Sequence, residues 1–232
     1  MRVKQFRYGL DNFSYLIYGD RFAVAIDGGA VREIFSSVKT QGLTLTYITV
    51  THSHPDHTAG SHELLNGSGA TYLDTQALLE KKAIDLGGEL IHVYHTPGHT
   101  RDSITFHAGD RLITGDTLFN GTVGNCFSGD LKSFYQSIKM ILEFPDEYIV
   151  YAGHDYVEES MAFAKRLEPN NADIDLFLKK YNPAHLFSTL FEERKINPYL
   201  RFNEPHIISL LQKRGLPVET EYQRWESLMS IE

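Results

Sequence analysis

The chain has little cysteine, no long apolar run and no excess of positive charge, and each lack excludes a class of protein. Its 232 residues contain one cysteine, Cys126, so no internal disulfide can form and a reducing, cytoplasmic setting is expected. No apolar run approaches the ~20 residues that a membrane helix needs, so a membrane protein is not expected. Residues 1–8 carry cations but no apolar segment with a small-residue cleavage site, so no secretion signal is expected.

The charge balance is acidic. Acidic residues number 30 and basic residues 22, which gives a formal net charge of -8. Such a chain repels the phosphates of nucleic acid instead of releasing their counterions. The basic residues are scattered, and the densest cluster, 192–195, is diluted by its own acids. Nucleic acid is therefore not an expected partner, and the apolar content of 42% fits an ordinary globular core with one extension.

What the chain does hold is a dense group of metal-binding side chains. His52, His54, Asp56 and His57 follow one another closely, directly after the apolar run 45–50. Imidazole nitrogens and carboxylate oxygens are donors that zinc, iron or manganese accept, and a turn after a strand lets neighbouring side chains converge. The pattern H-x-H-x-D-H therefore predicts a metal site.

Three more donors follow at intervals along the chain. His99, Asp116 and His154 each come shortly after a predicted strand. Histidines also gather by chance in solvated loops, but donors that recur at strand ends are typical of sites rather than of packing. The whole set therefore predicts a metal centre built from successive loops.

The order of the predicted elements indicates the architecture. Strands are predicted within 3–26 and at 45–50, 70–73, 90–94, 103–107, 111–114 and 147–151, and helices at 30–41, 59–65 and 131–142. Two strand-rich halves separated by helices predict an α+β fold, with two sheets sandwiched between helices and a metal cleft along one edge. Helical patterns separated by prolines dominate the rest of the chain. We therefore expect a metal-binding catalytic domain at 1–167 and a helical, substrate-binding extension at 168–232.

The donors, in this order and in these loops, resemble the ligand set of the metallo-β-lactamase superfamily over roughly residues 3–165. The resemblance implies the αββα sandwich of that superfamily. Because this fold carries hydrolases, nucleases and oxidoreductases alike, the resemblance implies metal binding without fixing a substrate.

Further segments narrow the resemblance to one family. The chain is similar to glyoxalase II, the hydroxyacylglutathione hydrolases, at 11–13, 115–119, 153–156, 163–170 and 197–201. When the family's ligands are transferred to the matching positions of this sequence, one metal is held by His52, His54 and His99. The other is held by Asp56, His57 and His154, and Asp116 bridges the two metals. The resemblance implies two divalent ions, of which zinc is the expected metal and iron or manganese the alternatives. It also implies that Asp116 and Asp56 are the catalytic carboxylates.

The same resemblance implies a reaction. A hydroxide shared by the two ions would attack a small-molecule thioester, S-D-lactoylglutathione or a related one, since bound metal lowers the pKa of water from ~15.7 to ~7. No Ser-His-Asp or Cys-His arrangement is then needed. Asp155 is expected to orient the imidazoles, as are Thr51, Thr100 and Thr117, although threonines also cap loops. The oligomeric state is left open.

The substrate-binding residues that the family implies are partly present. Tyr156 matches a tyrosine that contacts glutathione, and Arg201 matches the arginine of an Asn-Pro-x-x-Arg segment. In the loop after the bridging aspartate, Asn125 and Phe127 stand where the family carries a basic residue and an aromatic one. Because Asn125 has no positive charge, glutathione would lose a charge-assisted contact worth ~1.5–3 kcal/mol, which leaves a different thiol carrier open.

Two other functions stay open. A persulfide dioxygenase of the same superfamily would hold a single iron with His52, His99 and Asp116. Other hydrolases of the fold would act on a lactone, a β-lactam or a phosphodiester. The lack of a secretion signal argues against a β-lactam, and the acidic charge argues against nucleic acid. Cys126 is interpreted as a small apolar filler rather than a redox-active thiol.

Overall fold

The structure is a computed structural model that describes residues 1–231. It contains a five-stranded sheet in the order β1-β2-β3-β4-β5 and a six-stranded sheet in the order β13-β12-β9-β8-β7-β6. The strands of the first sheet are β1 (Arg2–Tyr8), β2 (Asn12–Tyr18), β3 (Phe22–Ile26), β4 (Thr44–Thr49) and β5 (Thr71–Tyr72). Those of the second are β6 (Ala83–Asp85), β7 (Leu90–His95), β8 (Ile104–Ala108), β9 (Arg111–Gly115), β12 (Ile149–Ala152) and β13 (Ser188–Thr189). A separate pair is formed by β10 (Leu118–Phe119) and β11 (Thr122–Val123).

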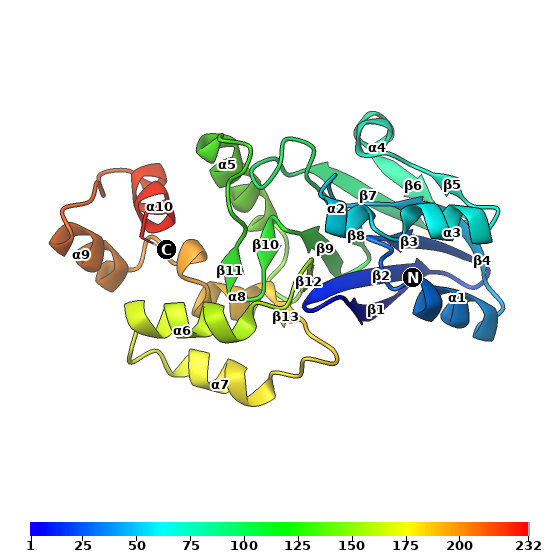
Figure 1. Ribbon diagram of the computed structural model, residues 1–232. Helices are drawn as coiled ribbons and strands as arrows, with labels where there is room; N and C mark the ends of the chain where they lie inside the picture. The colour runs from blue at the N-terminus through cyan, green and yellow to red at the C-terminus, as the bar shows by residue number, and fades with distance from the viewer. Residues whose placement is uncertain (232) are drawn as a thin grey trace.

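Helices flank the sheets, with α1 and α3 beside the first sheet and α5 beside the second (Figure 1). The first helices are α1 (Val31–Thr40), α2 (Pro55–Thr58), α3 (Ser61–Gly67), α4 (Thr75–Lys81), α5 (Leu131–Ile141) and α6 (Val157–Leu167). They are followed by α7 (Ala172–Lys180), α8 (Leu190–Ile196), the 3₁₀ turn η1 (Pro198–Leu200), α9 (Pro205–Lys213) and α10 (Glu221–Met229). No helix within residues 1–231 is long and apolar enough to cross a membrane.

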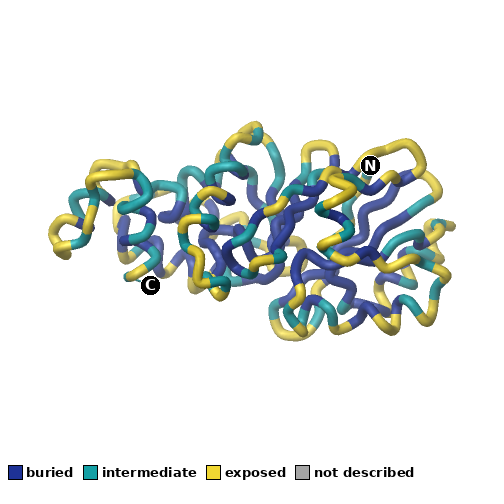
Figure 2. Tube along the Cα trace, turned by 90° about the horizontal axis from the view of Figure 1, so that it is seen from above, coloured by how far each residue is buried: buried dark blue, intermediate teal, exposed yellow. Residues whose placement is uncertain are grey.

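The core lies in layers because successive side chains of a strand point to opposite faces. Ile17 and Val24 of the first sheet pack against Phe106 of the second, which fills the space between the sheets. Leu16 points the other way and packs with Ile34 of α1. Figure 2 shows this pattern as a buried interior with exposed positions in loops and on outer helix turns. The predicted sandwich of two sheets between helices is thereby confirmed.

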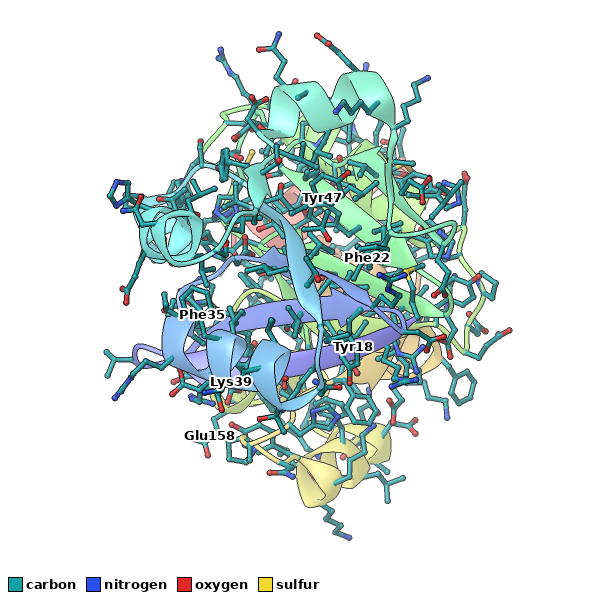
Figure 3. All side chains as sticks on the ribbon, turned by 90° about the vertical axis from the view of Figure 1, so that its right-hand side faces the viewer. Tyr18, Phe22, Phe35, Lys39, Tyr47 and Glu158 are labelled. Atoms are coloured by element: carbon teal, nitrogen blue, oxygen red, sulfur yellow. The ribbon has the colours of Figure 1, made fainter. Side chains whose placement is uncertain are left out.

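The outer face of the first sheet can be followed in Figure 3, where α1 lies in front of the strands. Phe35 is partly buried against the apolar cluster under this helix, whereas Lys39 is exposed. This amphipathic pattern is the one from which the sequence predicts a helix at 30–41. The helix predicted at 131–142 is confirmed as α5, and Asp130 caps it by accepting the N–H of Ser133 at 3.0 Å.

The carboxy-terminal part shares a core with the sandwich. Leu112 and Val150 on the outer face of the second sheet belong to one cluster with Phe134 of α5 and Trp225 of α10. The short strand β13 pairs antiparallel with β12 and extends the second sheet. Sequence patterns predict only helices in this region, so the strand is an addition. The division at residue 168 stays a proposal, since both parts contribute to one cluster and one sheet.

Candidate metal centre

Donor side chains from four loops meet where strands of both sheets end. β3 and β4 run parallel, as do β9 and β12, so the carboxyl ends of each pair lie at one edge. The loop after β4 and the helix α2 carry four donors, and the loops after β7, β9 and β12 carry one each. The donors are His52, His54, Asp56, His57, His99, Asp116 and His154. The structure thus brings together every donor that the sequence pattern singles out.

The first group of donors consists of His52, His54 and His99. Nδ1 of His54 lies 3.0 Å from Nε2 of His52 and 3.0 Å from Nε2 of His99. One ring nitrogen from each of the three lies within 4.8 Å of the others. Three imidazole nitrogens converging on one point are the donor set of a metal site with an open position.

The second group consists of Asp56, His57 and His154. Nε2 of His57 lies 3.1 Å from Nε2 of His154. Oδ2 of Asp56 lies 3.2 Å from Nε2 of His154 and 3.5 Å from Nε2 of His57. Asn12 fixes this carboxylate by donating from Nδ2 to Oδ2 at 2.8 Å. Two imidazoles and one carboxylate form a second set of metal donors.

Asp116 lies between the two groups. Its Oδ2 is 3.4 Å from Nε2 of His99 in the first group and 3.4 Å from Nε2 of His154 in the second. Its Oδ1 lies 3.3 Å from Nε2 of His57, yet it accepts no well-directed hydrogen bond from residues 1–231 although the side chain is buried. A buried carboxylate oxygen without a hydrogen bond is costly, and a cation at this place would satisfy it.

The backbone around Asp116 is shaped to keep space at this point. A Cβ at Gly153 would stand 2.1 Å from Oδ1 of Asp116 and 2.9 Å from Cε1 of His57. A Cβ at Gly124 would stand 2.0 Å from the backbone oxygen of Asp116. Any other residue at either position would displace a donor. The donor types, the orphaned oxygen and the glycines together fit bound divalent metal.

Burial and charge set the protonation of the donors. Burial, followed by the charge of His57, lowers the pKa of His52 to about 3, so this ring is neutral. Burial works to lower the pKa of His57, but the carboxylates of Asp27 and Asp116 outweigh it and raise that pKa to about 11. Burial works to raise the pKa of Asp116, but the nearby imidazoles of His154 and His57 hold it well below its usual range. A metal would thus meet an ionised Asp116 carboxylate and compete with a proton for His57.

An outer layer of acceptors fixes the ring orientations. Asp27, with a side-chain exposure of 0%, lies 2.9 Å from Nδ1 of His57 through Oδ2. Oδ1 of Asp11 lies 3.0 Å from Nδ1 of His154. A ring that donates from Nδ1 presents Nε2 to the centre as a lone pair, which is how outer carboxylates usually support histidine ligands.

Two family models match the chain. The one described as metallo-beta-lactamase superfamily matches residues 7–73 and 72–154, and the one described as hydroxyacylglutathione hydrolase C-terminus matches residues 155–228. The hydroxyacylglutathione hydrolase of Pseudoalteromonas translucida is 30% identical over 249 residues, which cover 100% of this chain and 97% of that protein. The chain belongs to the hydroxyacylglutathione hydrolase family of the metallo-β-lactamase superfamily. The resemblance seen in the sequence is therefore confirmed.

Solved structures agree on the fold of this hydrolase. ETHE1 from Myxococcus xanthus superposes with a TM-score of 0.70 at 24% identity, covering 100% of this chain and 91% of that one. TTHA1623, in a di-iron-bound form, superposes with a TM-score of 0.61 at 24% identity, covering 85% of this chain and 100% of that one. At these identities the likeness shows the metallo-β-lactamase fold and nothing finer.

Of the four residues expected to orient the imidazoles of the hydrolase, three form their hydrogen bonds with other partners. Thr51 does contact a donor, with Oγ1 3.1 Å from Nδ1 of His52. Asp155 instead accepts from Arg7 and from the hydroxyl of Tyr181, both at 2.7 Å. Thr100 bonds within its own loop, to Asp102 and Ser103, and Thr117 donates from Oγ1 to the backbone oxygen of Thr96 in the loop after β7. The expectation is wrong for Asp155, Thr100 and Thr117, whose polar groups are occupied by these partners.

Three of the four predicted substrate-binding residues surround the histidines. The ring of Tyr156 stacks on His154 with centroids 5.1 Å apart. The ring of Phe127, 67% exposed, lies 5.2 Å from that of His99. The backbone oxygen of Asn125 is 2.9 Å from Nδ1 of His99. These residues thus border the two donor groups.

Arg201 is in a different environment. Its guanidinium lies against the buried carboxylate of Glu168, with Nε 2.8 Å from Oε2 and Nη2 2.8 Å from Oε1. Nε2 of His206 is 2.7 Å from the same carboxylate. The pair lines a groove between α9 and the loop that joins α6 to α7. The charge of Arg201 is thus neutralised within the protein, in a groove that none of the seven donors lines.

The turn between β10 and β11, which precedes Asn125 in the chain, is supported by a buried acid. Glu193 of α8, fully buried, accepts the N–H of Gly121 at 3.0 Å and the Nδ2 of Asn197 at 2.9 Å. Nδ2 of Asn197 also donates to the backbone oxygen of Thr122 at 3.1 Å. The carboxy-terminal part therefore holds the β10-β11 turn of the hydrolase in place.

Glu193 should make stability fall as pH rises. Burial raises its pKa from 4.5 to about 7, against hydrogen bonds from Ser188 and Asn197 that lower it. An acid whose pKa is higher in the folded state than in the unfolded state stabilises the fold fully at a pH below its unfolded pKa. This stabilisation is lost as the pH rises through the folded pKa, and the loss amounts to roughly 3 kcal/mol between about pH 4.5 and 7. Unfolding in urea at pH 5 and pH 8 should show this loss in the wild type but not in Glu193→Gln. Equal pH dependence of the two proteins would contradict the assignment.

Proposed function

We propose that this hydrolase binds two divalent ions and cleaves acyl thioesters, with S-D-lactoylglutathione or a related thioester as substrate. The observation that carries the proposal is the pair of donor groups joined by Asp116. The name of the 30% identical relative supports the substrate class. The di-iron-bound form of TTHA1623, a protein of the same fold, agrees with two ions.

The donors divide between the ions as their distances suggest. One ion would lie among His52, His54 and His99, and the other among Asp56, His57 and His154, with Asp116 contacting both. When bound, the ions would supply the nucleophile, a hydroxide between them, and polarise the thioester carbonyl, because bound metal lowers the pKa of water from ~15.7 to ~7. Zinc, iron and manganese all accept this donor set. Asp116 and Asp56 are the carboxylates that touch the reacting centre.

Other side chains of the site hold the donors and receive the substrate. Asp27 and Asp11 fix the rings of His57 and His154 from outside. The rings of Tyr156 and Phe127 flank the donors and offer apolar surface to an acyl or thiol group. No serine or cysteine nucleophile is needed in this arrangement.

Metal analysis combined with a thioester assay tests the proposal. Purified protein should contain two divalent ions per chain and should release free thiol from S-D-lactoylglutathione. Exhaustive chelation should remove the activity, and added zinc, iron or manganese should restore it, since the nucleophile depends on bound metal. Elemental analysis and a colorimetric thiol assay measure both quantities.

Two results would count against the proposal. Full turnover after chelation would separate the reaction from the metal centre. One iron per chain, no thioester turnover and oxygen uptake with glutathione persulfide would support the dioxygenase alternative instead.

A further inference from the structure

One side of α6 forms a wall of a cavity of about 250 Å³ beside the donors. The wall consists of Tyr156, directly before the helix, and of Glu159, Ser160, Phe163 and Arg166 along it. Their spacing of three and four residues places them on one helical face. The opposite wall comes from the β10-β11 region and its loop, through Phe119, Thr122, Val123 and Asn125.

One end of this cavity adjoins the metal centre. Tyr156 stacks on His154, and the ring of Phe119 lies 6.0 Å from that of His154. Asn125 contacts His99 through its backbone oxygen. A substrate whose acyl group lies at the donors can therefore extend its leaving group into the cavity.

The other end of the cavity holds Arg166, whose charge has no partner. Within residues 1–231 its guanidinium forms no ion pair or hydrogen bond, and it lies over the ring of Phe163, 5.2 Å from the centroid. The adjacent Lys165 differs, because it bonds Asp175 at 2.8 Å. Arg166 is exposed and is the only basic side chain that lines the described cavity.

The position of the guanidinium sets the length of the ligand. Arg166 reaches back along α6 to the level of Phe163, seven residues beyond Tyr156. At ~1.5 Å per helical residue, the charge lies about 10 Å from the tyrosine that stacks on the donor ring. An extended small peptide spans this length with about three residues at ~3.3–3.6 Å each.

Charge along the cavity favours an anion at the far end only. Glu159 lies between Tyr156 and Arg166 and also has no ion-pair partner within the described chain. Its carboxylate repels an anion close to the thioester sulfur, whereas Arg166 attracts one farther away. Asn125 adds no charge to the loop side, and Arg201 is neutralised by Glu168.

We propose that Arg166 binds an anionic group on the thiol half of the substrate, about 10 Å from the donor end of the cavity. This inference rests on the proposed thioesterase function and names its leaving group: a small thiol with a carboxylate or phosphate at its far end. Arg166 thereby takes the part that the uncharged Asn125 does not fill.

Kinetics of Arg166→Gln with matched thioesters test the inference. With S-D-lactoylglutathione, KM should rise about tenfold with kcat within twofold, because a charge-assisted contact outside the reacting centre is lost. With the uncharged lactoyl thioester of N-acetylcysteamine, KM should not change. Arg166→Lys should recover part of the loss. Lactoyl coenzyme A tests whether the anion is a carboxylate or a phosphate. If Arg166→Gln raises KM about tenfold for this thioester and not for S-D-lactoylglutathione, the anion that Arg166 binds is a phosphate.

Arg32→Gln is the matched control. Arg32 is exposed on α1, against the other sheet, and its loss changes the net charge by the same amount. It should leave every KM unchanged. Equal KM changes for charged and uncharged thioesters in Arg166→Gln, or an equal change in Arg32→Gln, would overturn the inference.

Binding separates failure of this inference from failure of the proposed function. If the metal-loaded wild type hydrolyses no thioester, the proposed function fails. Calorimetric binding of S-methylglutathione and of coenzyme A to the wild type and to Arg166→Gln then decides the role of Arg166 alone. About tenfold weaker binding of either in the variant supports an anion-binding residue, and equal binding of both overturns it.

Discussion

Asp116→Asn should reduce bound metal below two ions per chain and lower kcat for thioester hydrolysis at least about a hundredfold. Its carboxylate is the group that touches both donor sets, through Oδ2 to His99 and His154 and through Oδ1 to His57. An amide offers one neutral oxygen where the site provides two anionic ones. Its NH₂ group would also face imidazole nitrogens that are needed as lone pairs. Elemental analysis and initial rates at saturating metal measure the two losses.

Asp20→Asn provides the control for this variant. Asp20 is 94% exposed at its side chain and, among the described residues, contacts only Arg2 at the surface, so the same chemical change should alter neither metal content nor rate. Circular dichroism should show that both variants are folded. An Asp116→Asn protein that keeps two ions and more than a tenth of the wild-type rate would remove the bridging role from the proposal.

The metal donors were predictable because their information is local. His52, His54, Asp56 and His57 stand in one turn after an apolar strand, and residue type alone marks them as ligands. The remaining donors each follow a strand, and parallel strands bring such positions to one edge. Alternation of strands and helices likewise predicted the sandwich, because each sheet must bury both faces.

The outer layer could not be predicted in the same way. Asp27 reaches the cluster because β3 pairs parallel with β4, with Ile26 beside Thr49, so that the residue after one strand lies next to Thr51. This register is a property of the sheet and not of any short motif. The one local sign of Asp27's role in the sequence is its position before Gly28-Gly29 at the end of a strand, and many ordinary turns have the same pattern.

The charges around the substrate cavity show a similar limit. Arg201 lies in a family-like segment, yet its partner Glu168 is 33 residues away in the chain and cancels its charge. Arg166 lies in an amphipathic helix, where sequence predicts a solvated cation. Only the packing of α6 against the β10-β11 region turns that face into a cavity wall. Which cations are free is decided by tertiary contacts.

The strand β13 was missed for a related reason. Ser188-Thr189 is too short to show a period, and the prolines around it favour helices with breaks. Its pairing with Ile149 and Val150 becomes visible only in the folded sheet. The strand also has a consequence next to the metal centre, since α8, which follows it, carries the Glu193 that holds the β10-β11 turn.

Asp27→Asn should weaken metal binding about 10–100-fold and destabilise the folded protein by about 3 kcal/mol. The buried carboxylate receives the N–H of Thr51 at 2.7 Å, its Oγ1 at 2.8 Å and Nδ1 of His57 at 2.9 Å. An asparagine has one acceptor oxygen for three donors, and its own N–H groups would oppose one of them. His57 would then lose the bond that turns Nε2 toward the centre. Metal titration and urea unfolding measure the two effects separately.

Asp11→Asn distinguishes orientation of a ring from general stability. Asp11 contacts Nδ1 of His154 at 3.0 Å as Asp27 contacts that of His57, but its side chain is 35% exposed. Because water can replace the lost contact, Asp11→Asn should cost within about 1 kcal/mol of stability while still weakening metal binding. Excess metal should restore much of the rate in both variants, since all the direct donors are intact. Metal affinity in Asp27→Asn equal to that of the wild type would mean that packing alone, without the carboxylate, holds His57 in place.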